Sequence, residues 1–141
     1  MSCYKYHDAV VDDVTQPGLN DFLLIQSDVC VSLAQMLMQY QRERGGQIEL
    51  RDIKKPERDT WGTKLEACEA ALQLAKKVND SLLGLRRVAR KNCDRHMMGF
   101  ISVKLLKKQA ESVNTLSSFL TELKTAGEGY GKPGTKEVGS A

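Results

Sequence analysis

Several signatures of metal, redox and membrane proteins are absent from this chain of 141 residues, in which aromatic residues make up only 6%. Its four cysteines are Cys3, Cys30, Cys68 and Cys93. No two of them form a Cys-x-x-Cys pair, so neither a zinc site nor a redox dithiol is indicated. No apolar run approaches the ~20 residues of a membrane span, and the N-terminus lacks the apolar core of a signal peptide. We therefore expect a cytoplasmic protein without a membrane segment.

Motifs of phosphate-binding and nucleophilic enzymes are missing as well. The pair Gly45-Gly46 is not followed by the lysine–serine pair of a phosphate-binding loop. Neither His7 nor His96 stands in an obvious nucleophile–base pair with a cysteine. No catalytic arrangement of either kind is therefore indicated.

The charge distribution does not favour a nucleic-acid binder. The formal net charge is +3, and residues of both signs are interspersed, whereas nucleic-acid binders usually concentrate basic residues on one face. The densest basic cluster consists of Arg86, Arg87, Arg90, Lys91 and Arg95. Basic side chains suit the negative C-terminal end of a helix. We therefore favour a solvated helix face over a phosphate site, and we expect no nucleic-acid partner.

Apolar residues recur at three- and four-residue steps in three long stretches, which is the pattern of amphipathic helices. The predicted helices cover residues 19–44, about 60–90 and about 95–125. Gly45-Gly46 ends the first helix, Pro56 marks a break before the second, and Asp94 is a good N-cap for the third. The pattern predicts an all-α fold.

The long connection between the first two predicted helices decides how they are arranged. Residues 45–59 form a loop of ~15 residues, which is longer than most helix connections. Such a loop returns the chain along a bundle, so that the next helix starts at the same end. We divide the chain into a divergent lead-in of residues 1–16, a helical domain of residues 17–126 and a Gly-rich tail of residues 127–141, which we expect to be disordered.

The stretch RGGQIELRDIKKP, from Arg44 to Pro56, resembles the start of the long crossover loop of ferritins. Matching residues follow downstream: Trp61-Gly62-Thr63, Val78-Asn79, Ser81-Leu82-Leu83, Asp94, His96, Phe100-Ile101 and Gln109. The resemblance covers residues 12–124 in one gap-free register. It implies a ferritin-like helical bundle with three long helices retained, iron as the stored metal, and ferritin subunits or further copies of this chain as partners. The family's first long helix finds no counterpart in this register.

The resemblance also implies where the residues that oxidise Fe(II) would lie. In this fold, a di-iron site needs inward carboxylates and a histidine, with Glu-x-x-His spacing on one helix. The two positions aligned with that Glu and His are occupied here by Cys30 and Leu33, and the position of the carboxylate on the next helix is occupied by Ala75. Among the aligned positions of the di-iron site, only Gln109 carries the same residue as the family. Because iron favours charged oxygen ligands and imidazole, we expect no ferroxidase activity and no enzyme.

Two other positions complete the candidate metal-contacting residues. Asp28 is the only acidic residue on the helix face where some family members nucleate mineral. The acidic residues of the channel through which iron enters fall on Gly99 and Ser102, although His96 is retained nearby. His96 also fits a surface histidine in the first turn of a helix. The candidates are thus Gln109, Asp28 and His96.

The leading prediction is an iron-binding and iron-storage subunit that serves intracellular iron homeostasis without ferroxidase activity. One alternative is a helical interaction module that co-assembles with or caps intact ferritin subunits without handling iron. The other alternative is an active ferroxidase.

Overall fold

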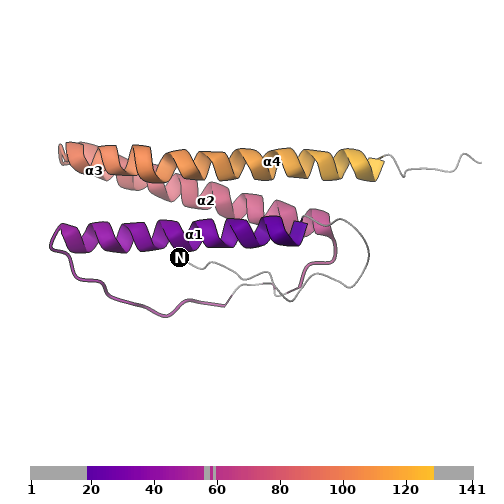
Figure 1. The fold of residues 1–141 in the computed structure, drawn as a ribbon, viewed down its shortest axis with the longest axis horizontal. Coiled ribbons are helices and arrows are strands. Elements are labelled where there is room, and N and C mark those ends of the chain that lie inside the picture. Colours follow the sequence, from indigo (N-terminus) through magenta and orange to yellow (C-terminus); the bar gives the residue numbers. More distant parts are fainter. Residues whose placement is uncertain (1–18, 56–57, 59, 129–141) are drawn as a thin grey trace, which may run out of the picture.

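The computed structural model describes residues 19–55, 58 and 60–128. The helices are α1 (Leu19–Glu43), α2 (Lys64–Lys91), α3 (Arg95–Phe100), the π-helical segment η1 (Ile101–Leu106) and α4 (Lys107–Glu128). Segments α3, η1 and α4 follow one another as a single rod, which lies with α1 and α2 in a bundle (Figure 1). The described residues contain no strand. The prediction of an all-α fold is confirmed. The lead-in of residues 1–16 and the tail from residue 129 lie outside the described residues.

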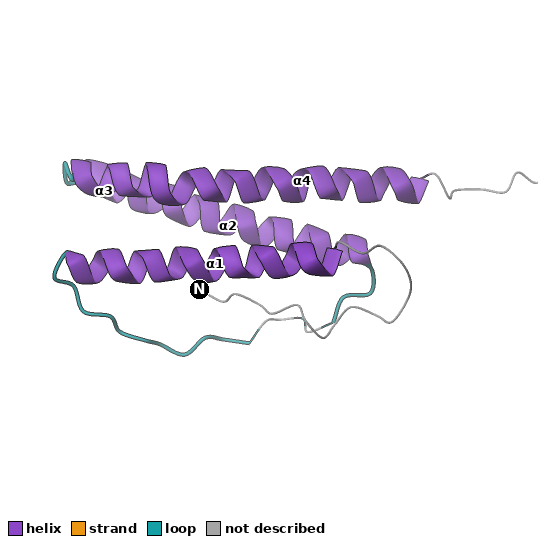
Figure 2. Cartoon of the chain, in the orientation of Figure 1, coloured by secondary structure: helices purple, strands orange, loops and turns teal. Residues whose placement is uncertain are grey.

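The connections give the bundle its topology. The loop after α1 runs back along the bundle, so that α1 and α2 start at the same end, as predicted (Figure 2). Gly45 has φ 77°, the left-handed conformation that favours glycine at a helix end. A short turn joins α2 to α3 and reverses the chain direction, so the rod that ends in α4 runs antiparallel to α2.

The helix starts are fixed by capping side chains. Thr63 has an extended backbone, and its hydroxyl accepts a hydrogen bond of 3.2 Å from the Glu66 N–H. Because of this cap, α2 begins at Lys64 rather than at the predicted residue 60, and Trp61 lies before the helix. Asp94 caps α3 as predicted, with its carboxylate accepting the Met97 N–H at 2.9 Å.

The core consists of two apolar clusters along the bundle. The first contains Leu23, Cys68, Leu72, Ala75 and Leu116, and the second contains Leu33, Leu82, Ala89, Ile101 and Leu105. Each cluster takes side chains from α1, α2 and the rod of α3, η1 and α4. Stacking of Phe22 on Phe119, with ring centroids 5.3 Å apart, adds a further contact between α1 and α4.

The apolar residues of α1 do not all face the core. Leu33 is only 1% exposed, whereas Ile25 on the same helix is 58% exposed. At 3.6 residues per turn, eight positions rotate a side chain by about 80° from the starting direction, so the two residues cannot share one narrow contact line. Leu72 and Leu82 face inward and do not contribute to an open surface.

The segment Asp21–Glu43 of α1 is long and apolar enough to cross a membrane, judged by length and composition alone. This is weak evidence for a membrane segment, because core helices of soluble bundles pass the same test. Leu23, Leu33 and Tyr40 of this helix are buried against the rest of the bundle.

Candidate functional site

The structure gathers three of the four positions compared with the di-iron site around one small cavity. This partly open pocket of about 50 Å³ between α1, α2 and α4 is called the interior cavity here, and its lining residues are Leu23, Gln26, Ser27, Cys30, Ala71, Leu74, Ala75, Val78, Gln109 and Ser112. Cys30, Ala75 and Gln109 therefore meet there, although they lie far apart in the sequence. The fourth position, Leu33, is instead buried in the second apolar cluster, beside Ile101 and Leu105.

Gln109 is the most constrained polar group of this interior cavity. Its side chain is 2% exposed, and Nε2 donates a hydrogen bond of 2.9 Å to the carbonyl oxygen of Ala75. The other amide atom, Oε1, is buried without a hydrogen-bond partner. A buried acceptor of this kind costs about 1–3 kcal/mol when it is left unsatisfied.

The chemistry of the interior cavity does not fit an iron ion. Its polar groups are a thiol, carboxamides and hydroxyls, and neither a carboxylate nor an imidazole lines it. Iron ions favour those two ligand types. Across residues 19–55, 58 and 60–128, no group of three or more His, Cys, Asp and Glu side chains is placed to hold a metal ion.

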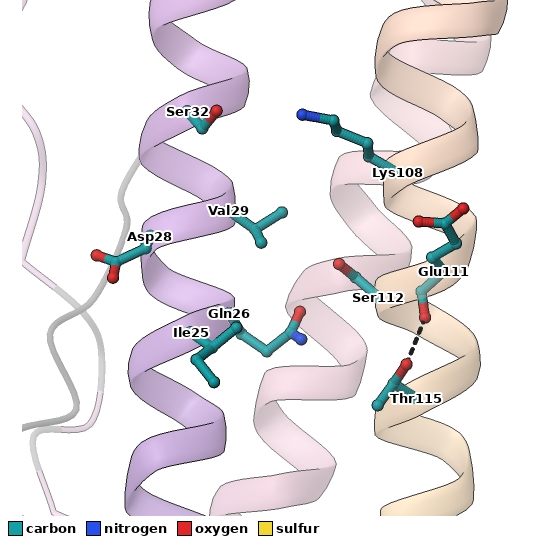
Figure 3. A pocket seen from close by; sticks show the side chains of 9 residues that line it. All are labelled: Ile25, Gln26, Asp28, Val29, Ser32, Lys108, Glu111, Ser112 and Thr115. Atoms are coloured by element: carbon teal, nitrogen blue, oxygen red, sulfur yellow. Dashed lines mark hydrogen bonds between the residues drawn. The ribbon is translucent and has the colours of Figure 1, made fainter.

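Asp28 lies beside a second, open groove between α1 and α4. Residues from both helices line this groove of about 500 Å³: Ile25, Gln26, Asp28, Val29, Ser32, Lys108, Glu111, Ser112 and Thr115 (Figure 3). In this view, Asp28 points away from α4, whereas Lys108 reaches toward α1. Glu111 is a second carboxylate, which the sequence analysis missed because it is contributed by another helix. The two carboxylates do not converge (Figure 3).

His96 belongs to a third place, where the end of α1 meets the start of α3. Its Nδ1 atom lies 2.9 Å from the hydroxyl of Tyr40, which also accepts a hydrogen bond of 2.9 Å from Arg44. The Tyr40 ring stacks on Phe100, with centroids 4.0 Å apart. His96 is thus a surface histidine in a first turn, as one interpretation of the sequence expected, but one ring nitrogen is engaged in the protein.

An ion pair closes this contact between α1 and α3. Arg44 donates two hydrogen bonds to the carboxylate of Asp94, at 2.8 and 3.3 Å. The hydrogen bond from Arg44 and that from the Met97 N–H hold the pKa of Asp94 below its ordinary value, and the Asp94 carboxylate in turn raises the pKa of Arg44. Asp94 was predicted as a helix cap, but its pairing with Arg44 was not predicted from the sequence.

Gln109, Asp28 and His96 therefore occupy three separate places: the interior cavity, the groove between α1 and α4, and the contact of α1 with α3. The structure does not bring the three candidates together into one site. What it assembles instead is the long parallel pair α1 and α2, the crossover between them, and a buried glutamine on the antiparallel α4. This is the architecture of a ferritin-like helical bundle.

Comparisons with known proteins agree with this class. The family description "Ferritin-like domain" matches residues 1–126. The chain is 46% identical over 121 residues to the soma ferritin of Lymnaea stagnalis, a match that covers 86% of this chain and 70% of that protein. It is 40% identical over 126 residues to the middle-subunit ferritin of Aquarana catesbeiana, covering 89% of this chain and 70% of the relative. A middle-subunit ferritin of Salmo salar is 43% identical, with 79% of this chain and 64% of the relative covered.

The chain belongs to the ferritin family. The family match includes residues 1–11, which precede the start of the resemblance traced in the sequence. The chain spans about two thirds of the length of these relatives.

Proposed function

We propose that this chain is an iron-storage subunit that serves intracellular iron homeostasis in the cytosol without ferroxidase activity of its own. One observation carries the proposal. The interior cavity brings together Cys30, Ala75 and Gln109, the positions that the family register assigns to iron ligands, and none of them carries a charged oxygen or an imidazole.

The position of Leu33 adds to this argument. A histidine at that position would have to direct a polar ring toward the cavity, but Leu33 is 1% exposed and packs in the second apolar cluster. Burying a polar group there without a partner would cost free energy. In this proposal, the chain forms part of the wall of an assembly that stores iron. Oxidation of the iron takes place on other subunits or at the mineral surface.

Assembly with ferritin subunits, or with further copies of this chain, is part of the proposal. Large apolar side chains are exposed at several helix positions: Ile25, Val31, Val88 and Val103. Their exposed fractions reach 58% for Ile25 and 63% for Val103. Exposed apolar area of this kind favours association, because burial releases ~25 cal/mol per Å².

The same exposed residues favour a second candidate function, in which the chain co-assembles with or caps ferritin subunits without handling iron. The two functions differ in one measurable quantity. A storage subunit keeps or raises the iron content of a mixed assembly, whereas a capping module lowers it in proportion to its share of the subunits.

The test begins with iron oxidation. Anaerobic protein is mixed with Fe(II) and then with oxygen, beside a ferritin subunit known to be ferroxidase-active and a protein-free blank. We expect the rate of the blank, because the cavity offers no charged ligands. Rapid oxidation that saturates with the amount of protein would overturn the proposal. Iron loading of assemblies purified after co-expression with the active subunit then separates storage from capping.

A further inference from the structure

A surface pocket near the C-terminal end of α2 is not used by the proposed function. Five residues line this pocket of about 370 Å³: Leu83, Arg86, Arg87, Arg90 and Met98. The first four stand at positions i, i+3, i+4 and i+7 of α2 and therefore share one face of the helix. Met98 comes from α3, across the short turn. The volume lies within the range of small-molecule sites, about 300–1,000 Å³.

The three arginines of this pocket carry charge that the protein itself does not neutralise. Within the part of the chain that the structure describes, Arg86, Arg87 and Arg90 form no side-chain ion pair or hydrogen bond, and all three are exposed. The position in the helix accounts for the charge of Arg90 but not for the charges of Arg86 and Arg87. The helix dipole favours cations only within the last turn, which contains Arg90 but not Arg86 or Arg87. Like charges four residues apart, as in Arg86 and Arg90, also destabilise a helix.

One wall of the pocket is cationic and the other is apolar, and this combination restricts the chemical class of ligand that fits. Guanidinium groups bind phosphate through paired hydrogen bonds and stack on flat rings. Leu83, which is 37% exposed, and the half-buried Met98 offer an apolar surface beside them. A thioether makes favourable contacts with aromatic rings.

We propose that this pocket binds a small anion of the nucleoside polyphosphate class. The phosphates contact Arg86, Arg87 and Arg90, and the flat base lies against Leu83 and Met98. The proposal does not depend on the iron-storage function, since no group of the interior cavity contributes to the pocket. An anion of this charge also relieves the repulsion among the three guanidinium groups.

The experiment measures binding of ATP to the full chain by calorimetry at low salt. The double variant Arg86→Gln/Arg90→Gln removes two pocket charges. Its matched control is Lys76→Gln/Lys77→Gln, which removes the same charge from exposed positions on the same helix outside the pocket. We expect the pocket variant to weaken ATP binding by about tenfold or more, because each lost contact is charge-assisted, and the control to leave it unchanged.

The apolar part of the site is tested with tripolyphosphate and adenosine as separate probes. We expect Leu83→Ala to weaken ATP binding but not tripolyphosphate binding, and adenosine alone to bind more weakly than ATP. Circular dichroism confirms that each variant is folded, and the single variant Arg87→Gln replaces the double variant if that one is not. Absence of saturable ATP binding at millimolar concentration would overturn the proposal. Equal weakening by the pocket and control variants would do the same, because it would show non-specific attraction to a basic surface.

Discussion

The guanidinium of Arg44 donates two hydrogen bonds, of 2.8 and 3.3 Å, to the carboxylate of Asp94, which lies 50 positions later in the sequence. Arg44 follows α1 directly, and Asp94 is the N-cap of α3. The pair therefore ties the end of the first helix to the turn between the second and third helices. Tyr40 joins them, because its hydroxyl accepts from Arg44 and its ring stacks on Phe100.

This pair makes stability depend on pH in acid. Because Arg44 and the Met97 N–H lower the pKa of Asp94 in the folded protein, the folded state binds fewer protons than the unfolded state. The contribution is complete above the ordinary Asp pKa of 3.8 and is lost as the pH falls through the lower folded value. We expect Arg44→Gln to lower the melting temperature at pH 7, and we expect this effect to shrink as the pH falls below 3.8. Thermal melts across this range, with the exposed Arg42→Gln as control, provide the measurement. An Arg44 effect independent of pH would contradict the ion-pair account.

Buried and exposed apolar residues of α1 should respond very differently to truncation. Leu33→Ala removes a side chain that is 1% exposed and packs in the second apolar cluster. We expect it to lower the free energy of unfolding by about 2–5 kcal/mol. Ile25→Ala, at a position 58% exposed in the single chain, should change it by less than about 0.5 kcal/mol when the protein is diluted to the monomer. Urea unfolding monitored by circular dichroism compares the two. Similar losses for both variants would mean that Ile25 is buried in solution, for instance by association.

The sequence predicted the helices well because each signal was local. The stop at Gly45-Gly46 and the cap at Asp94 act within a few residues of themselves, and both are observed. The start of α2 was placed four residues too early, since Thr63 was not recognised as a cap. The π-helical segment from Ile101 to Leu106 also gave no sequence signal.

The contacts between helices were much harder to predict. The family register named Cys30, Ala75 and Gln109, but spacing alone could not show that they share one small cavity. The pairing of Arg44 with Asp94 and the groove that adds Glu111 opposite Asp28 arise from the packing of distant helices. Such contacts leave no periodic pattern in the chain.

The buried amide of Gln109 should contribute little net stability. Its Nε2 donates to the carbonyl of Ala75, which is worth about 0.5–1.5 kcal/mol, but its unpartnered Oε1 costs a similar amount. Gln109→Met keeps the volume and removes both atoms, so we expect unfolding free energy to change by less than about 1 kcal/mol. Gln109→Glu places a charge in the same cavity and should destabilise strongly at neutral pH, with recovery as the carboxylate is protonated. Denaturant melts at two pH values test both variants. A large loss in Gln109→Met would show that the amide is satisfied in solution.

Association of the whole chain is the prediction that bears most directly on function. Ile25 and Val103 expose more than half of their surfaces on different helices, and burying apolar area of this kind between chains favours association. We therefore expect sedimentation at micromolar concentration to show species heavier than the 15.7 kDa chain, or co-sedimentation with an intact ferritin subunit. The double variant Ile25→Lys/Val103→Lys should shift the distribution toward the monomer, whereas Lys76→Gln/Lys77→Gln should not. A compact monomer that melts cooperatively and exposes no dye-binding apolar surface would contradict the prediction, because the apolar area would then be covered within a single chain.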